Sequence, residues 1–167
     1  MVLEHLPKLV EKSMINKLSQ VQAQYRDKLM EEVSYKVHVA LPKGKGFFGQ
    51  VYTSFNMKKM PEKDLPLFMD FYGLKIENLV INGKKIDQTK NGSYKNGTIN
   101  LSLGDALKLG NNTVQMHFFN EYRNDGYGFH SFLDEVDKQQ YIYTKFEPAF
   151  CHYVFPTFDQ PDLKASW

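Results

Sequence analysis

The chain has 167 residues, enough for one domain or for one domain with an appendage. Its net charge is +2 and no basic cluster is interleaved with aromatic residues, so the composition does not indicate nucleic-acid binding. A single cysteine, Cys151, excludes an internal disulfide, and no apolar run reaches the ~20 residues that cross a bilayer. The amino terminus lacks the apolar stretch of a secretory leader. We therefore expect an intracellular, cytoplasmic protein without a membrane span.

A helical pattern comes first in the chain. From Val2 to Val33, apolar residues recur every three or four positions, which is the spacing of one helix face. Two helices with a break around Ser13 to Asn16 are the alternative. The apolar stripe either packs on the sheet of its own chain or docks in a groove of a protein partner. The candidate partner-docking stripe consists of Leu6, Val10, Met14, Leu18, Val21 and Tyr25.

Alternation of apolar and polar residues, which is typical of half-buried strands, follows the helix. Strands are expected at residues 33–41, 47–57, 65–73, 97–103, 111–122 and 139–148, with a hairpin at 77–87 and a short turn or helix at 103–111. Asn82-Gly83 suits the type I′ turn of that hairpin. The pattern predicts a mainly β fold, an antiparallel saddle or sandwich-like domain over residues 33–167, preceded by a long amphipathic helix within residues 1–32.

Metal-binding and nucleophile motifs are missing from the sequence. The histidines are scattered and none forms an i, i+4 pair; they are His5, His38, His117, His130 and His152. Cys151 and His152 are adjacent, but no third group is in place to orient them as nucleophile and base. Asp134, Glu135 and Asp137 lack the spacing of a calcium-binding loop. We interpret residues 120–137 as a solvated loop between two strands.

Lys145 and Glu147 share one face of the last expected strand with Tyr141 and Tyr143. A carboxylate among aromatic rings can recognise an ammonium group through charge-assisted hydrogen bonds. Alternatively, Glu147 pairs with Lys145, two residues away on the same face. The residues alone leave both interpretations open.

The last stretch, YTKFEPAFCHYVFPTFDQPDLKASW, resembles a signature in the N-terminal domain of the M1 family of zinc aminopeptidases. That signature reads Tyr-Thr-Gln-Phe-Glu-Pro, then Phe-Pro-Cys-Phe-Asp-(Glu/Gln)-Pro and Lys-Ala. Upstream, NEYRNDGYGFHSFLDEVDKQQYIYT is similar to the family's loop and strand, and the resemblance covers about Arg26 to Trp167. The retained framework residues are Phe146, Pro148, Phe155, Pro156, Phe158, Asp159, Pro161 and Lys164.

The resemblance implies a saddle-shaped β domain that packs against a thermolysin-like catalytic domain. In the family, the zinc ligands, the general base and a Gly-x-Met-Glu-Asn loop lie in that second domain. This chain has neither that motif nor His-Glu-x-x-His, so we expect no cofactor on it, and zinc only with a downstream catalytic domain. The family's Gln-x-Glu helps to bind the free amino terminus of the substrate, which implies that role for Glu147, with Lys145 at the glutamine position.

Departures from the signature also lie at Thr157, where the family usually has cysteine, at His152 and Tyr153, where it tends to have arginine, and at Glu135, which replaces a common proline. The family's domain continues with further strands after the Lys-Ala, so we expect an open sheet edge. Either the remaining strands exist outside this chain, or a protein partner covers that edge.

Three functions follow from these observations. The leading hypothesis is a non-catalytic module, a structural or interaction subunit of a larger assembly. The alternative is the N-terminal part of an active zinc aminopeptidase. A third hypothesis is a small-ligand-binding β domain that uses exposed Tyr127, Phe129 and Phe132 as a platform.

Overall fold

The structure is a computed structural model that describes residues 18–87 and 93–167. It is mainly β, as the alternation predicts. In chain order its elements are α2 (Gln20–Leu29), β1 (Met30–Ala40), β2 (Gly46–Met57), β3 (Phe68–Asp70), β4 (Lys75–Ile81), β5 (Lys84–Lys85), β6 (Tyr94–Lys95), β7 (Thr98–Asn100), the 3₁₀ helix η1 (Leu103–Asp105), β8 (Gly110–Glu121), β9 (Gly128–Leu133), β10 (Gln140–Lys145), the 3₁₀ helix η2 (Cys151–Tyr153) and β11 (Ala165–Ser166).

The strands form three sheets. The largest has the order β11-β1-β2-β8-β4-β5, and apart from the parallel β11–β1 pair its neighbours are antiparallel. A second sheet has the order β3-β7-β6, and β9 and β10 form a separate hairpin. One face of the large sheet carries the apolar core, to which Val51, Phe55 and Phe118 contribute fully buried side chains. The predicted antiparallel fold is therefore confirmed.

The turn between β4 and β5 forms as the sequence predicts. Asn82 has a φ of 51° and Gly83 a φ of 80°, the positive values that a type I′ turn requires. The Asn82 side chain donates hydrogen bonds to the Ala106 carbonyl and to Asn112 Oδ1, both at 2.8 Å. The turn is thus held to the segment that precedes β8.

Helix α2 begins with a capping box, in which the Ser19 hydroxyl accepts from the Gln22 N–H and the Gln22 side chain accepts from the Ser19 N–H. The helix ends at Leu29, so the prediction of a helix to Val33 is wrong. Met30 donates the last helical hydrogen bond, to the Arg26 carbonyl, but its backbone is already extended and it pairs with Met57 of β2. The described helix has ten residues and is short rather than long.

The expected docking stripe is only partly within the described residues. Leu6, Val10 and Met14, and the alternative break near Ser13, lie outside them. Tyr25 packs against the core of its own chain, and its hydroxyl donates to the Leu65 carbonyl (2.8 Å). Leu18 is half-buried, and Val21 remains 74% exposed. The described part of the helix therefore packs on its own domain.

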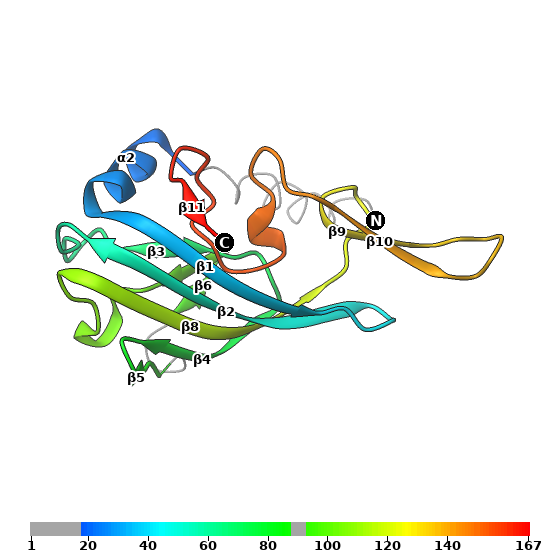
Figure 1. Cartoon of the computed structure of the whole chain (residues 1–167), viewed down its shortest axis with the longest axis horizontal. Coiled ribbons are helices and arrows are strands. Elements are labelled where there is room, and N and C mark those ends of the chain that lie inside the picture. Colours follow the sequence, from blue (N-terminus) through cyan, green and yellow to red (C-terminus); the bar gives the residue numbers. More distant parts are fainter. Residues whose placement is uncertain (1–17, 88–92) are drawn as a thin grey trace, which may run out of the picture.

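The prediction of a solvated loop over residues 120–137 is wrong for its second half. Residues 128–133 form β9, which pairs with β10 from Gly128↔Lys145 to Leu133↔Gln140. The strand begins with a glycine because Gly128 has a φ of 62°, and a Cβ there would lie 3.0 Å from Cβ of Tyr153. The β9–β10 hairpin extends away from the large sheet, on the right of Figure 1.

The outer edge of β1 is partly covered. β11 pairs with it in parallel at Val33 and Ser34, and it lies beside β1 near the carboxyl terminus in Figure 1. The predicted strands at 65–73 and 97–103 are shorter in the structure, at three residues each. Within the described ranges, no helix is both long and apolar enough to cross a membrane.

Candidate functional site

The signature stretch divides into two parts with different surroundings. We call residues 150–160 the anchor segment and residues 128–147 the projecting hairpin. Every residue from His152 to Phe158 is buried, whereas every residue from Thr144 to Pro148 is exposed. The anchor segment therefore belongs to the body of the domain, and the residues predicted to recognise a substrate lie on its surface.

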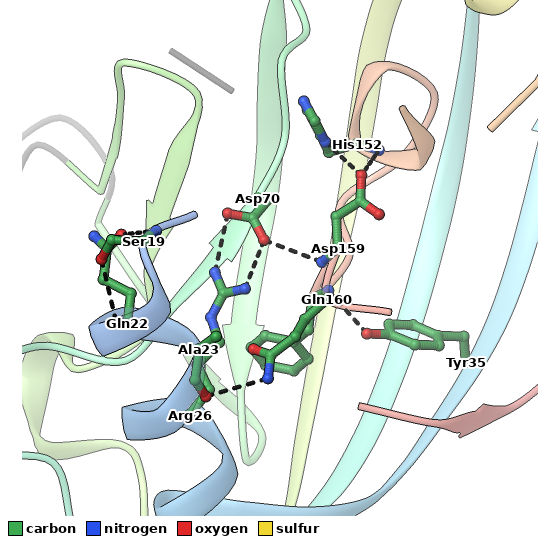
Figure 2. Close-up of polar contacts among 10 residues, drawn as sticks. Ser19, Gln22, Ala23, Arg26, Tyr35, Asp70, His152, Asp159 and Gln160 are labelled. Atoms are coloured by element: carbon green, nitrogen blue, oxygen red, sulfur yellow. Dashed lines mark hydrogen bonds and ion pairs between the residues drawn. The ribbon is translucent and has the colours of Figure 1, made fainter. Parts of the chain in front are cut away.

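A buried ion pair holds the anchor segment to helix α2 and strand β3 (Figure 2). Nη2 of the Arg26 guanidinium donates to Asp70 Oδ1 (2.9 Å), Nη1 forms an ion pair with Asp70 Oδ2 (2.8 Å), and Arg26 is only 1% exposed. Asp70 Oδ2 also accepts a hydrogen bond from the Asp159 N–H (3.0 Å). Because an unpaired charge at this depth is costly, each partner depends on the other.

Asp159 extends this network to η2. Its carboxylate accepts from the His152 backbone N–H (3.1 Å) and contacts His152 Nδ1. Next to it, the Gln160 side chain donates to the Ala23 carbonyl of α2 (3.1 Å), as Figure 2 shows. His152, one of the departures from the family signature, is thus a structural residue of the anchor segment.

The neighbouring Cys151 is not activated as a nucleophile. Burial raises the pKa of its thiol, and the negative charge of Asp159 raises it further. A thiol with a raised pKa stays protonated, and Nδ1 of the adjacent His152 faces Asp159 rather than Cys151.

Tyr35 fixes the other end of the anchor segment. Its hydroxyl accepts from the Phe158 N–H (2.9 Å) and shares a hydrogen bond with the Thr157 side chain. Burial raises the pKa of Tyr35 to about 12. Two backbone hydrogen bonds between Thr157 and Asp70, at 2.7 and 3.0 Å, complete the attachment. Thr157, where the family usually has cysteine, is therefore fully accommodated in this fold.

Tyr153 joins the anchor segment to the chain that leads into the projecting hairpin. The Arg123 guanidinium lies 3.9 Å from the centroid of the Tyr153 ring, and Asn120 Nδ2 donates to the Tyr153 carbonyl (2.6 Å). Arg123 also contacts Asp125. Burial alone would raise the pKa of Asp125, but the hydrogen bond and charge of Arg123 outweigh it, so the pKa is lowered. Arg123 therefore holds both segments.

Lys145 and Glu147 do not form the ion pair that was one alternative. Lys145 Nζ lies 5.0 Å from the centroid of the Tyr127 ring, within the range of a cation–π interaction. Glu147 follows the end of β10, is exposed, and has no hydrogen-bond or ion-pair partner among residues 18–87 and 93–167. Tyr141 and Tyr143 are also exposed and stack on Phe132 and His130 of β9. The free carboxylate thus lies at the end of an aromatic strand.

The aromatic platform expected from Tyr127, Phe129 and Phe132 does not exist. Phe129 is only 9% exposed, because its ring packs edge-on against Phe47 in the core. Tyr127 packs on Phe150, with ring centroids 4.1 Å apart, and only Phe132 remains exposed.

The described part of the chain does not fit a zinc ion, because it holds no group of three or more His, Cys, Asp or Glu side chains that could ligate one. The framework residues divide between the two parts. Phe155, Pro156 and Phe158 are buried, Asp159 is half-buried, and Phe146, Pro148, Pro161 and Lys164 are exposed. Glu135 is exposed near the tip of the projecting hairpin.

The chain is thus an antiparallel β domain in which the second part of the signature stretch is buried. Residues 31–167 match the family described as Peptidase M1 N-terminal domain, and the chain belongs to this family. It is similar to Aminopeptidase N of Streptomyces lividans, with 34% identity over 100 residues. Those residues are 60% of this chain and 11% of that relative, so the alignment spans a small part of the longer protein.

Sequence reasoning missed the residues that position this site. Arg26 and Asp70 are 44 residues apart, and no local pattern links them. Gln140 was also missed. Its side chain accepts from the Gly44 N–H and donates to the Gly44 carbonyl, both at 2.8 Å, which attaches β10 to the β1–β2 turn. The sequence signal that could have indicated the buried ion pair was Arg26, which follows Tyr25 near the apolar face of the predicted helix.

Proposed function

We propose that this domain is the part of an M1 aminopeptidase that recognises the free amino terminus of a peptide substrate, with Glu147 as the recognising group. The observation that carries the proposal is the exposed Glu147 carboxylate, which has no partner among the described residues. A carboxylate accepts strong, charge-assisted hydrogen bonds from an ammonium group. The hydrogen bond from the Phe150 N–H to the Phe146 carbonyl (2.8 Å) connects the residue before Glu147 to the anchor segment.

Lys145 is the residue that speaks against recognition, because a like charge weakens ammonium binding. Its contact with the Tyr127 ring supports the proposal, since the ring interacts favourably with the ammonium group and directs it toward residue 127. In this arrangement Glu147 keeps its charge available for a substrate. We assign peptide hydrolysis to none of the described residues, because they do not fit zinc.

Binding of a short peptide tests the proposal. The probe is Leu-Gly-Gly amide, compared with its N-acetylated form, and binding is followed by backbone amide chemical shifts of the chain. We expect the free amino terminus to bind more tightly, and Glu147→Gln to weaken it by about tenfold. Glu135→Gln, which changes another exposed carboxylate, is the matched control and leaves binding unchanged. Equal binding of both peptides by the unchanged chain would refute the proposal.

The second candidate is the non-catalytic interaction module. It is favoured by Lys145 at the family's glutamine position and by the apolar residues Leu133 and Val136 at the hairpin tip, the latter 93% exposed. Lys145→Gln separates the two functions. Under the recognition function it strengthens binding of the free amino terminus, because a cation is removed. If neither Lys145→Gln nor Glu147→Gln changes binding, the interaction module becomes the better account.

A further inference from the structure

The hydrogen bonds between β9 and Arg123 show which backbone groups of β9 point toward β10 and which point away from it. The Arg123 N–H donates to the Phe129 carbonyl and the Arg123 carbonyl accepts from the Ser131 N–H, both at 2.8 Å. Backbone groups of alternate residues in a strand point to opposite edges. Residues 129 and 131 therefore face Arg123, and residues 128, 130 and 132 face β10. The hydrogen bond from the Asp134 N–H to the Gln139 carbonyl (2.9 Å) fits this alternation, because residue 134 also faces the second arm of the hairpin.

Among the described residues, nothing pairs with the outer edge of β10. Tyr141, Tyr143 and Lys145 lie opposite Phe132, His130 and Gly128, so their backbone groups bond to β9. The N–H and C=O groups of Ile142 and Thr144 point the other way. β10 has β9 as its single strand neighbour, and in the described part of the chain no other group bonds to the backbone of Ile142 or Thr144. A strand edge with alternating free donors and acceptors is a template for another strand.

We propose that this edge binds an extended peptide by antiparallel strand addition, with the amino terminus of the peptide at Glu147. The proposal rests on the proposed function for the identity of its occupant. An antiparallel strand runs opposite to β10, so its first residue lies at the end of β10 where Lys145 and Glu147 follow Thr144. A parallel strand would place its amino terminus near Gln140, away from the free carboxylate.

The structure also indicates where pairing stops. The Phe146 carbonyl already accepts from the Phe150 N–H (2.8 Å), so it is engaged and does not take an N–H of the peptide. The first peptide residue then lies opposite Phe146, and its ammonium group stays free for Glu147. In this register the third and fifth peptide residues lie opposite Thr144 and Ile142 and bond to them, while the fourth lies opposite Tyr143.

N-methylated peptides test the pairing. The probe is Ala-Thr-Val-Tyr-Val-Thr amide, with one N-methyl group at the third, fourth or fifth residue. Methylation at the third or fifth residue removes an N–H that faces β10, and we expect it to weaken binding by about tenfold. Methylation at the fourth residue is the matched control, because that N–H points away, and it leaves binding nearly unchanged. Equal losses at all three positions, or a loss only at the fourth, overturn the proposal.

Two variants test the same edge from the side of the protein. Thr144→Pro removes an outward N–H without removing a bond to β9, so the hairpin remains paired. We expect it to weaken binding of the unmethylated peptide, because one hydrogen bond to the peptide is lost, whereas Thr144→Val, which keeps the N–H, binds that peptide as the unchanged chain does. Hydrogen exchange provides a measurement that does not depend on mutation. The amides of Ile142 and Thr144 exchange rapidly in the free chain and slowly with peptide, while those of Tyr141 and Tyr143 are slow in both.

The outcomes also separate this inference from the proposed function. If the edge binds peptides, the N-acetylated hexapeptide still binds more weakly when it is methylated at the third or fifth residue than at the fourth. This result does not depend on Glu147. Loss of that pattern, with Glu147→Gln still weakening binding of the free amino terminus, overturns strand addition and leaves the proposed function intact. Protection of Ile142 and Thr144 in the absence of peptide, together with a dimer in sedimentation, overturns it in favour of a second copy of the chain.

Discussion

The anchor segment and the projecting hairpin come from one continuous signature, yet they are held in different ways. The anchor segment is buried and is hydrogen-bonded to α2, β1 and β3. The projecting hairpin is attached near its base by Arg123 and near its tip by the Gln140–Gly44 hydrogen bonds, and among the described residues Glu147 has no partner. A match to the buried half of the signature therefore indicates that the chain has this fold. The proposed recognition function rests on the exposed half, where the sequence departs from the family signature at Lys145.

The largest expected effect is loss of the buried ion pair. Asp70→Ala leaves the Arg26 guanidinium unpaired in the core and removes the acceptor for the Asp159 N–H. We expect the free energy of unfolding to fall by about 3–5 kcal/mol, measured by urea denaturation. Asp64→Ala, which changes an exposed aspartate nearby in the sequence, is the control and has little effect. A loss for Asp70→Ala no larger than for this control would show that the anchor segment does not depend on the pair.

A smaller effect is expected at Tyr35, with a defined dependence on pH. The pKa of Tyr35 is raised from 10.0 to about 12 in the folded chain, chiefly by burial, so the folded state favours the neutral phenol. The contribution of this pKa shift to the free energy of unfolding is fully present below pH 10. It is lost as the pH rises from about 10 to about 12. Tyr35→Phe removes the acceptor for the Phe158 N–H and costs about 1–3 kcal/mol.

The measurement is the free energy of unfolding as a function of pH, with tyrosine ionisation followed by absorbance. Tyr35→Phe flattens the alkaline part of this dependence. Tyr52→Phe, at a half-buried tyrosine on β2, is the control and retains it. An unchanged alkaline slope in Tyr35→Phe would indicate that another group is responsible.

Sequence patterns predicted the elements that depend on local alternation. β2 and β8 are twelve residues long with a period of two over most of their length, β1 alternates from Val33 onward, and each forms close to its expected range. β9 escaped prediction because it begins at Gly128 in a glycine-rich stretch and depends on pairing with β10. The helix end was misplaced because Met30 fits both a helical stripe and a strand. Pairing with Met57, which decides between them, is not local.

The residues of the candidate site could be named from the sequence, but their contacts with one another could not be predicted from it. Resemblance assigned a role to Glu147, and the residues themselves left open whether Lys145 neutralises it. The answer depends on Tyr127, eighteen positions before Lys145, whose ring comes close only because β9 and β10 pair. The same is true of Arg26 and Asp70. Their interaction is a property of the packed chain rather than of a motif.

A still smaller effect on stability is expected at Gln140, and it should be confined to the projecting hairpin. Gln140→Ala removes two hydrogen bonds to Gly44 and one to Ser131 Oγ (2.7 Å). We expect faster amide exchange in β9 and β10 and a loss of about 0.5–1.5 kcal/mol. Gln139→Ala is the matched control, because its side chain accepts only from exposed Lys43 (3.2 Å). Faster exchange throughout the large sheet as well would contradict the separation of the two regions.

The smallest effect on stability is expected for the contact between Lys145 and Tyr127. Tyr127→Leu keeps an apolar side chain beside Phe150 but removes the ring that attracts the ammonium group, a loss of about 0.5–1 kcal/mol. The ε-methylene protons of Lys145, shifted by the ring in the unchanged chain, should move to their ordinary positions. Released from the ring, Lys145 competes with a substrate ammonium for Glu147, so binding of a free amino terminus weakens. Tyr127→Leu combined with Lys145→Gln restores that binding, because the competing cation is gone. Binding that stays weak in the double variant would mean that Tyr127 acts on the site through packing and not through Lys145.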